Sequence, residues 1–173
     1  METQLVELGL ADWSAATPNE AWIAQLEAGK VLYFPRLGFE LLPEERSLLT
    51  PSLLSPDVRN ISLDANGKLK GVAGDEAVQR AAAAMVGRFR AQAQQLIHGL
   101  LPHYTPALRL APTSYRPAKV ETRVQSWRAD DRRLHVDAFP SRPNYGERIL
   151  RVFTNVNPDG APRVWRVGEP FED

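Results

Sequence analysis

Apolar and polar residues alternate with two different periods, one before and one after the middle of the chain. From Asp75 to about His98, apolar residues recur every three or four positions, which predicts one continuous helix with Phe89 on its buried face. After Pro106 the period shortens to two, as in strands with one buried side. We expect these strands near residues 119–127, 133–139, 148–156 and 163–167. Helices followed by strands predict an α+β architecture in which the long helix packs on this sheet.

Capping signals predict shorter elements in the first half. Residues 17–20 (Thr-Pro-Asn-Glu) have the order of a capping box, so a first helix is expected to start at Thr17 and to end at Gly29. Residues 31–34 indicate a short buried strand, and Pro43 opens a second short helix.

Turn and stop signals complete the pattern. The sequence Asp-Ala-Asn-Gly at residues 64–67 predicts a β-hairpin over 61–72. Asn-Pro-Asp-Gly at residues 157–160 predicts a turn between the last two strands. Gly99 and Pro102 are expected to end the long helix.

The composition is typical of a globular protein and excludes several kinds of site. The 173 residues are 43% hydrophobic and 24% charged, and no apolar run is long enough to span a membrane. Cysteine is absent, which excludes disulfides, zinc–thiolate sites and thiol catalysis. The acidic start lacks the basic region of a signal peptide, so we expect a cytoplasmic protein.

The net charge of zero hides an asymmetry. Residues 1–75 contain 6 Lys and Arg against 11 Asp and Glu, whereas residues 76–173 contain 15 against 10. The basic residues are mostly Arg, whose planar guanidinium suits carboxylate and phosphate oxygens. An anionic substrate and an ordinary solvated surface explain this pattern equally well. Nucleic-acid binding is not expected, because no basic stripe interleaves with aromatic residues.

His135 and Asp137 carry the clearest candidate chemistry. On a strand, residues two apart point to the same face, so the imidazole and the carboxylate would converge. These two groups are two thirds of the facial triad that holds non-haem Fe(II). A hydrogen-bonded surface pair without metal is the alternative, and the triplet alone does not decide between them. His98 and His103 precede the motif and are interpreted as capping or surface residues.

Five stretches carry a resemblance to a known family. They are residues 135–143 (HVDAFPSRP), 149–158 (ILRVFTNVNP), 163–171 (RVWRVGEPF), 29–35 (GKVLYFP) and 42–45 (LPEE). Together they resemble the Kdo hydroxylases, which are iron and 2-oxoglutarate oxygenases acting on the lipopolysaccharide sugar Kdo (3-deoxy-D-manno-oct-2-ulosonic acid). The resemblance covers the whole chain, and its most specific part runs from His135 to Pro158.

The resemblance implies a fold and a reaction. The fold would be a double-stranded β-helix of the jelly-roll or cupin kind, buttressed by N-terminal helices. Fe(II) would be bound by His135, Asp137 and a distal histidine, and 2-oxoglutarate by an arginine beyond that histidine. The cosubstrate would be decarboxylated to succinate and CO₂ while C3 of Kdo is hydroxylated to give Ko, with ascorbate as a supporting reductant.

Further residues are candidates for binding the cosubstrate and the substrate. The candidates for 2-oxoglutarate are Arg123, Gln125 and Asn155. The candidates for the carboxylate and phosphates of Kdo-lipid A are Arg142, Arg148 and Arg151. A structural role is equally open for each. Trp127 and Trp165 are interpreted as packing residues rather than sugar platforms.

The sequence departs from the family pattern after Asp137, because no histidine follows that residue. We therefore expect residues 1–173 to be a single, C-terminally truncated oxygenase domain that is inactive alone. Residues 1–105 would be its helical part and 106–173 its first core strands. An incomplete sheet also predicts homo-oligomers or aggregation.

Three functions remain open. The first is a hydroxylase of Kdo-lipid A in the cytoplasm, with peripheral contact to the inner membrane. The second is a phytanoyl-hydroxylase-like oxygenase with a small soluble substrate. The third is a metal-free β-rich binding module, which iron affinity separates from the other two.

Overall fold

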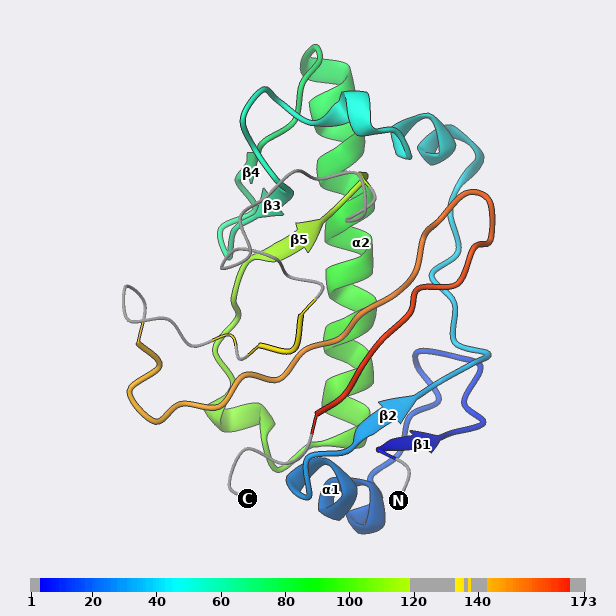
Figure 1. The fold of residues 1–173 in the computed structure, drawn as a ribbon, viewed down its shortest axis with the longest axis vertical. Helices are drawn as coiled ribbons and strands as arrows, with labels where there is room; N and C mark the ends of the chain where they lie inside the picture. Colours follow the sequence, from blue (N-terminus) through cyan, green and yellow to red (C-terminus); the bar gives the residue numbers. More distant parts are fainter. Residues whose placement is uncertain (1–3, 119–132, 136, 138–142, 169–173) are drawn as a thin grey trace.

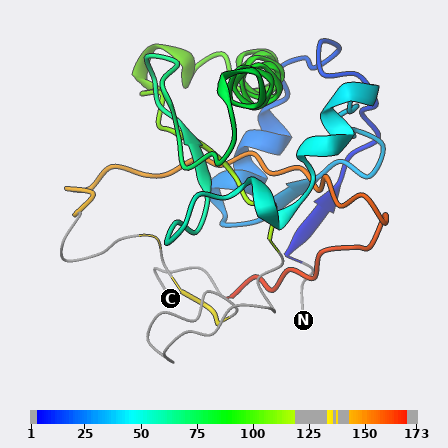
Figure 2. The same ribbon diagram turned by 90° about the horizontal axis from the view of Figure 1, so that it is seen from above.

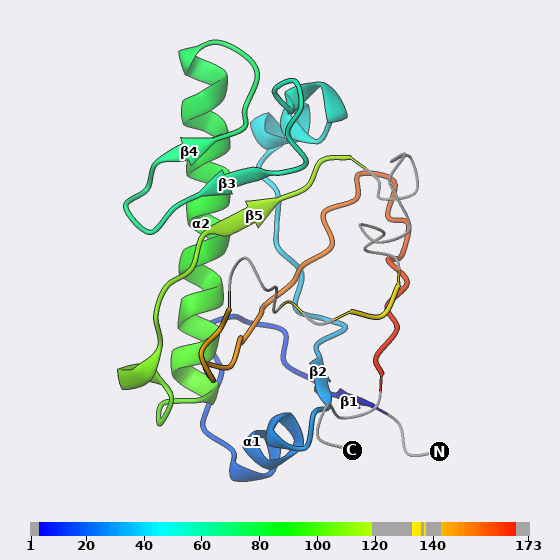
Figure 3. The same ribbon diagram turned by 60° about the vertical axis from the view of Figure 1, so that its left-hand side comes forward.

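The computed structural model describes residues 4–118, 133–135, 137 and 143–168. One long helix, α2 (Glu76–Leu100), forms one side of the molecule, and the strands and the later chain lie on the other side of it (Figures 1, 2 and 3). The carboxylate of Asp75 caps the helix by accepting a hydrogen bond of 2.9 Å from the amide of Val78. The predicted long helix is confirmed.

The helix continues through Gly99, where the sequence predicted its end. A Cβ at position 99 would lie 2.6 Å from the carbonyl oxygen of Ala16. Gly99 therefore allows the chain near Ala16 to pass close to the helix, and its role is packing rather than termination. The helix ends one residue later, with Leu101 as the C-cap.

The predicted hairpin is present and forms part of a three-stranded antiparallel sheet. It consists of β3 (Ile61–Leu63) and β4 (Leu69–Lys70), and the sheet has the order β4-β3-β5. Gly67 has a φ of +81°, which its turn requires and which glycine adopts without strain. The third strand, β5 (Thr113–Tyr115), pairs with β3 after the chain has passed through α2.

A second sheet has two parallel strands, β1 (Leu5–Glu7) and β2 (Val31–Tyr33). The two sheets lie near opposite ends of α2 (Figures 1 and 3). Strand β2 is the predicted strand at 31–34, but it is not buried, since Val31 and Tyr33 are 41% and 49% exposed. Among the described residues β1 is the strand that pairs with it.

Helix α1 (Glu20–Glu27) joins these two strands, and its predicted start at Thr17 is wrong. Asn19 is the N-cap, and its side-chain oxygen accepts a hydrogen bond of 2.9 Å from the amide of Ala21. Asn is a stronger N-cap residue than Thr, so the helix begins two residues later than predicted. Gly29 follows the helix with a φ of +77°, as expected for the residue after a C-cap.

Three short 3₁₀ helices complete the regular structure of the described residues: η1 (Pro43–Leu48), η2 (Pro51–Leu53) and η3 (Thr105–Ala107). The short helix predicted at Pro43 is confirmed as η1. None of the helices in the described ranges is long and apolar enough to cross a membrane.

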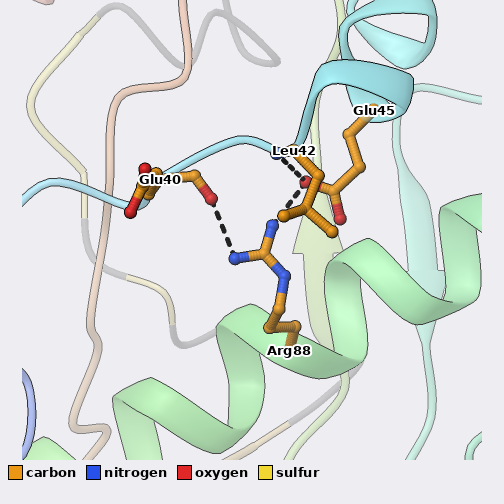
Figure 4. Close-up of polar contacts among 4 residues, drawn as sticks. All are labelled: Glu40, Leu42, Glu45 and Arg88. Atoms are coloured by element: carbon orange, nitrogen blue, oxygen red, sulfur yellow. Dashed lines mark hydrogen bonds and ion pairs between the residues drawn. The ribbon is translucent and has the colours of Figure 1, made fainter.

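An ion pair joins η1 to α2 (Figure 4). Glu45 is 5% exposed, and its Oε2 accepts hydrogen bonds from Arg88 Nη2 and, at 2.9 Å, from the amide of Leu42. Arg88 Nη1 donates to the carbonyl oxygen of Glu40 at 2.8 Å. The guanidinium also lies 4.2 Å from the ring centre of Phe39. This group of contacts, the Glu45–Arg88 node, fixes residues 39–45 against the helix.

The core lies between α2 and the β4-β3-β5 sheet. Ile61 is fully buried, and Met85 and Val86 from the helix are each 3% exposed. Phe89 is half-buried and makes edge-to-face contacts with Trp13 and Phe39, at centroid distances of 6.1 and 5.6 Å. The prediction that α2 packs on a sheet made by residues 119–167 is wrong for the described residues. The apolar surface that covers the helix comes instead from the β4-β3-β5 sheet, from η1 and η2, and from residues 13–39.

Tyr115 in β5 gives the fold a testable dependence on pH. Its hydroxyl donates a hydrogen bond of 3.0 Å to the carbonyl oxygen of Leu48, and burial raises the pKa of Tyr115 to about 12. The unfolded chain ionises near the ordinary tyrosine pKa of about 10, so the free energy of unfolding should fall as pH rises from about 10 to about 12. Tyr115→Phe should remove this part of the decline and cost about 1 kcal/mol at neutral pH.

Urea unfolding at neutral and alkaline pH measures both effects. Tyr33→Phe, at a half-exposed tyrosine of β2, is the matched control and should leave the alkaline decline intact. An unchanged decline in the Tyr115→Phe protein would show that another group causes it.

Residues 143–168 contain no strand, so the strands predicted at 148–156 and 163–167 are wrong in the structure as described. Burial nevertheless alternates along the first of these segments: Leu150, Val152 and Val156 pack against the core, whereas Phe153 is 57% exposed. The side-chain period of a strand is present without a neighbouring strand to form the hydrogen-bond ladder. The turn at 157–160 is confirmed, since the amide of Gly160 donates to the carbonyl oxygen of Asn157 at 3.1 Å.

The strands predicted at 119–127 and 133–139 fall mostly outside the described residues. Residues 133–135 and 137 are described and are not in a strand. The described residues thus form a mixed α and β structure with two small sheets. The part predicted to hold the first core strands, 106–173, contributes only β5 among its described residues.

Candidate metal centre

Asp137, a predicted iron ligand, is paired with an arginine. Arg151 Nη2 lies 2.8 Å from Oδ2 of Asp137, and the two side chains are 42% and 37% exposed. The alternating burial of residues 150–156 turns Arg151 away from the core, because Leu150 and Val152 on either side of it pack inward. The packed segment thus anchors the arginine that holds the carboxylate.

His135, the other predicted ligand, is oriented by the backbone. Its Nδ1 lies 2.7 Å from the carbonyl oxygen of Arg133, and a carbonyl can only accept, so Nδ1 carries the proton in this contact. The neutral ring then presents the lone pair of Nε2. Metal-bound histidines are usually held in this way, with one ring nitrogen donating to a carbonyl and the other bound to the metal.

The donors fit part of an iron site. An imidazole nitrogen and a carboxylate oxygen are the ligand types of the facial triad. Within the part of the chain that the structure describes, no three His, Asp or Glu residues are grouped so that they could hold a metal ion. The two exposed histidines near the end of α2, His98 and His103, do not complete such a group. Within the described residues the site therefore has two donors of the right kind, His135 and Asp137.

Two of the predicted binding residues have protein partners of their own. Arg148 Nη1 contacts Oε2 of Glu27 at the end of α1, and the hydroxyl of Tyr104 donates to the other oxygen of Glu27. Asn155 uses its amide to donate to the carbonyl oxygen of Ala161 at 2.9 Å, across the turn at 157–160. These contacts are structural, and binding of substrate or cosubstrate by Arg148 and Asn155 stays a prediction.

The remaining predicted residues lie outside the described ranges: Arg123, Gln125, Trp127 and Arg142. Trp165 is described and is 55% exposed, with its ring centre 4.6 Å from that of Phe153. The interpretation of Trp165 as a rim packing residue agrees with this contact. Glu27 and the Arg151–Asp137 pair were missed by sequence reasoning, because no local pattern links residues 14 or more positions apart.

Comparison with known proteins identifies the class. Residues 11–173 match the profile of the family described as 3-deoxy-D-manno-oct-2-ulosonic acid (Kdo) hydroxylase. The chain belongs to this family. A search of curated proteins gave no match.

Solved structures agree with the family. The chain is 44% identical to the Kdo hydroxylase KdoO, described as a non-heme Fe(II) α-ketoglutarate-dependent dioxygenase, in complex with cobalt(II), and the TM-score is 0.92. A second structure of KdoO, in complex with α-ketoglutarate and Fe(III), is also 44% identical, with a TM-score of 0.90. These matches cover 98% and 97% of this chain but only 58% and 57% of the KdoO chains. The chain thus spans somewhat more than half the length of the structures that it matches.

Proposed function

We propose that this chain provides the iron-binding first part of an Fe(II)- and 2-oxoglutarate-dependent dioxygenase that hydroxylates C3 of Kdo in Kdo-lipid A to give Ko. The observation that carries the proposal is the pair His135 and Asp137, in a chain that matches the Kdo hydroxylase family over residues 11–173. In each of the two donors one atom contacts a described residue: Nδ1 of His135 and Oδ2 of Asp137. KdoO, the similar protein, is described with iron, α-ketoglutarate and succinate.

His135 and Asp137 would hold the iron through Nε2 and Oδ1, together with a ligand from outside the described residues. When bound, iron and 2-oxoglutarate supply the oxidation of a C–H bond by O₂, and ascorbate keeps the metal reduced. The arginines at 142 and 148 would meet the anionic groups of the substrate, and Arg151, the third arginine predicted to do so, would bind substrate only when its contact with Asp137 is broken. In the structure Arg148 and Arg151 are paired with carboxylates, so substrate would have to compete for them.

We also propose that the complete domain is a double-stranded β-helix. The alternating burial along residues 150–156 supports a core strand of a double-stranded β-helix, and so does the length of KdoO beyond the matched region. Further strands would supply the missing ladder and cover the exposed rings of Phe153 and Trp165. We propose that residues 1–173 are the N-terminal part of such a domain. A cytoplasmic location, with peripheral contact to the inner membrane where Kdo-lipid A is found, follows from the proposed substrate.

This chain should bind Fe(II) but should not turn over 2-oxoglutarate. Anaerobic equilibrium dialysis should show one weakly bound Fe(II), with affinity lowered at least about tenfold by His135→Ala, which removes one donor, or by Asp137→Asn, which removes the negative charge of the other. Succinate formation from 2-oxoglutarate with ascorbate and Kdo-lipid A should stay near the level without protein, since a facial triad needs a third ligand.

His98→Ala is the matched control and should bind Fe(II) like the unaltered chain. If the His135→Ala and Asp137→Asn proteins bound Fe(II) as tightly as the unaltered chain, the result would favour the metal-free binding module instead. Strong turnover that is lost in a His98→Ala or His103→Ala protein would show that the ligand set is wrong. The second alternative, an oxygenase with a small soluble substrate, has no observation in its favour beyond the shared iron motif.

A further inference from the structure

The contact between Arg151 and Asp137 has a specific geometry. It joins one guanidinium nitrogen to one carboxylate oxygen, Oδ2, at 2.8 Å. Oδ1 is the second oxygen of the same carboxylate and is chemically able to bind a cation. Neither side chain is deeply buried, and ion pairs at such exposure contribute little to folding stability. The effect of this pair should therefore appear in the orientation of Asp137 more than in the stability of the protein.

The position of Arg151 is fixed by the packing of its neighbours. Leu150 and Val152 pack against the core, and the segment alternates, so the arginine emerges from an anchored stretch of backbone. Asp137 has no such anchor among the described residues, because neither it nor residues 133–135 lie in a helix or strand. The arginine thus gives the carboxylate an orientation that its own backbone does not impose.

We propose that Arg151 is a positioning residue that holds Oδ2 of Asp137 and directs Oδ1 toward the metal. This inference rests on the proposed function, in which His135 and Asp137 bind iron. It parallels the contact of His135 Nδ1 with the carbonyl oxygen of Arg133, which directs Nε2. Partners of this kind typically raise metal affinity 10- to 100-fold.

The charge of Arg151 opposes the effect of its geometry. A guanidinium near the site repels a divalent cation, but solvent and salt screen this repulsion at an exposed pair. The orienting contact acts over 2.8 Å, so salt weakens it less than a repulsion over a longer distance. Loss of Arg151 should therefore weaken metal binding, at the lower end of the usual range, by about tenfold.

Titration with Co(II), followed by NMR, tests the proposal on the 173-residue chain. The chain has three histidines, so broadening of the His135 ring signals reports the site, and His98 and His103 serve as internal references. Arg151→Gln should raise the dissociation constant about tenfold. Arg151→Lys, which restores one charged donor, should recover part of the affinity. Arg163→Gln, at an exposed arginine beyond the turn at 157–160, should bind like the unaltered chain.

Two further measurements separate the possible outcomes. Thermal unfolding of the Arg151→Gln protein should match that of the unaltered chain, as expected for a residue whose role is orientation. Unchanged or tighter Co(II) binding in Arg151→Gln, with weaker binding in Asp137→Asn, would overturn the role of Arg151 alone. Unchanged binding in Asp137→Asn and in His135→Ala, or no broadening at His135 at all, would overturn the proposed function and this inference together.

Discussion

Glu45→Ala is expected to lower the free energy of unfolding by about 3 kcal/mol, because it leaves one partner of a largely buried ion pair without its counter-charge. The carboxylate of Glu45 is the acceptor for both Arg88 and the amide of Leu42, so both lose it. Arg88 is 29% exposed and keeps its bond to the carbonyl oxygen of Glu40, which places the cost at the lower end of the range for such pairs. Urea unfolding at neutral pH measures the difference.

Glu44→Ala is the matched control for this substitution. Glu44 lies next to Glu45 in η1 but is exposed, so its removal should change the stability by less than about 0.5 kcal/mol. Similar losses in the two proteins would mean that the negative charge of η1, and not the Glu45–Arg88 node, is what stabilises the fold.

Phe89→Ala should cost about 3 kcal/mol, the lower end of the range for aromatic truncation, because the ring is only half-buried. The substitution removes the edge-to-face contacts with Trp13 and Phe39 and so loosens the N-terminal residues from α2. Denaturant unfolding followed by circular dichroism gives the loss.

Phe153→Ala is the control for this second prediction. Phe153 is the same residue type at 57% exposure, so its truncation should cost less than about 1 kcal/mol. A loss below about 1 kcal/mol in the Phe89→Ala protein as well would show that the aromatic cluster around α2 does not hold the N-terminal residues in place.

The elements that the sequence predicted correctly are those with signals inside the element itself. The N-cap at Asp75, the turn at 64–67 and the turn at 157–160 each act over a few residues, so they can be recognised without knowledge of the rest of the fold. The start of α1 was misplaced because two residues only two positions apart, Thr17 and Asn19, both have side chains that can cap a helix.

Strands depend on partners that a local pattern does not contain. The segment 148–156 has the side-chain alternation of a strand, yet a strand also requires a neighbour to complete its hydrogen bonds. In β1, only three residues long, pairing with β2 supplies what its own sequence does not indicate. For the same reason, the sequence predicted that α2 packs on a sheet made by residues 119–167, whereas in the structure it packs on the β4-β3-β5 sheet.

In the candidate site, too, some features can be predicted from the sequence and others cannot. The spacing of His135 and Asp137 is visible in the sequence, and the family match supports its interpretation. The partners that orient these residues are not visible: one is a backbone carbonyl, and the other is Arg151, which the sequence suggested for substrate. Residues that hold a ligand are chosen by position in space, so only the structure separates them from other arginines.

The pairing of β3 with β5 has a consequence for cooperativity. The chain between these strands, residues 64–112, contains β4 and all of α2. Closing a flexible loop of about 50 residues would cost roughly 3.5 kcal/mol in chain entropy. Once α2 is formed, half of that loop is a rigid rod, and far fewer conformations are lost when β5 reaches the sheet. The helix and the sheet therefore depend on each other, and a substitution that frays α2 should loosen β5 even where the two do not touch.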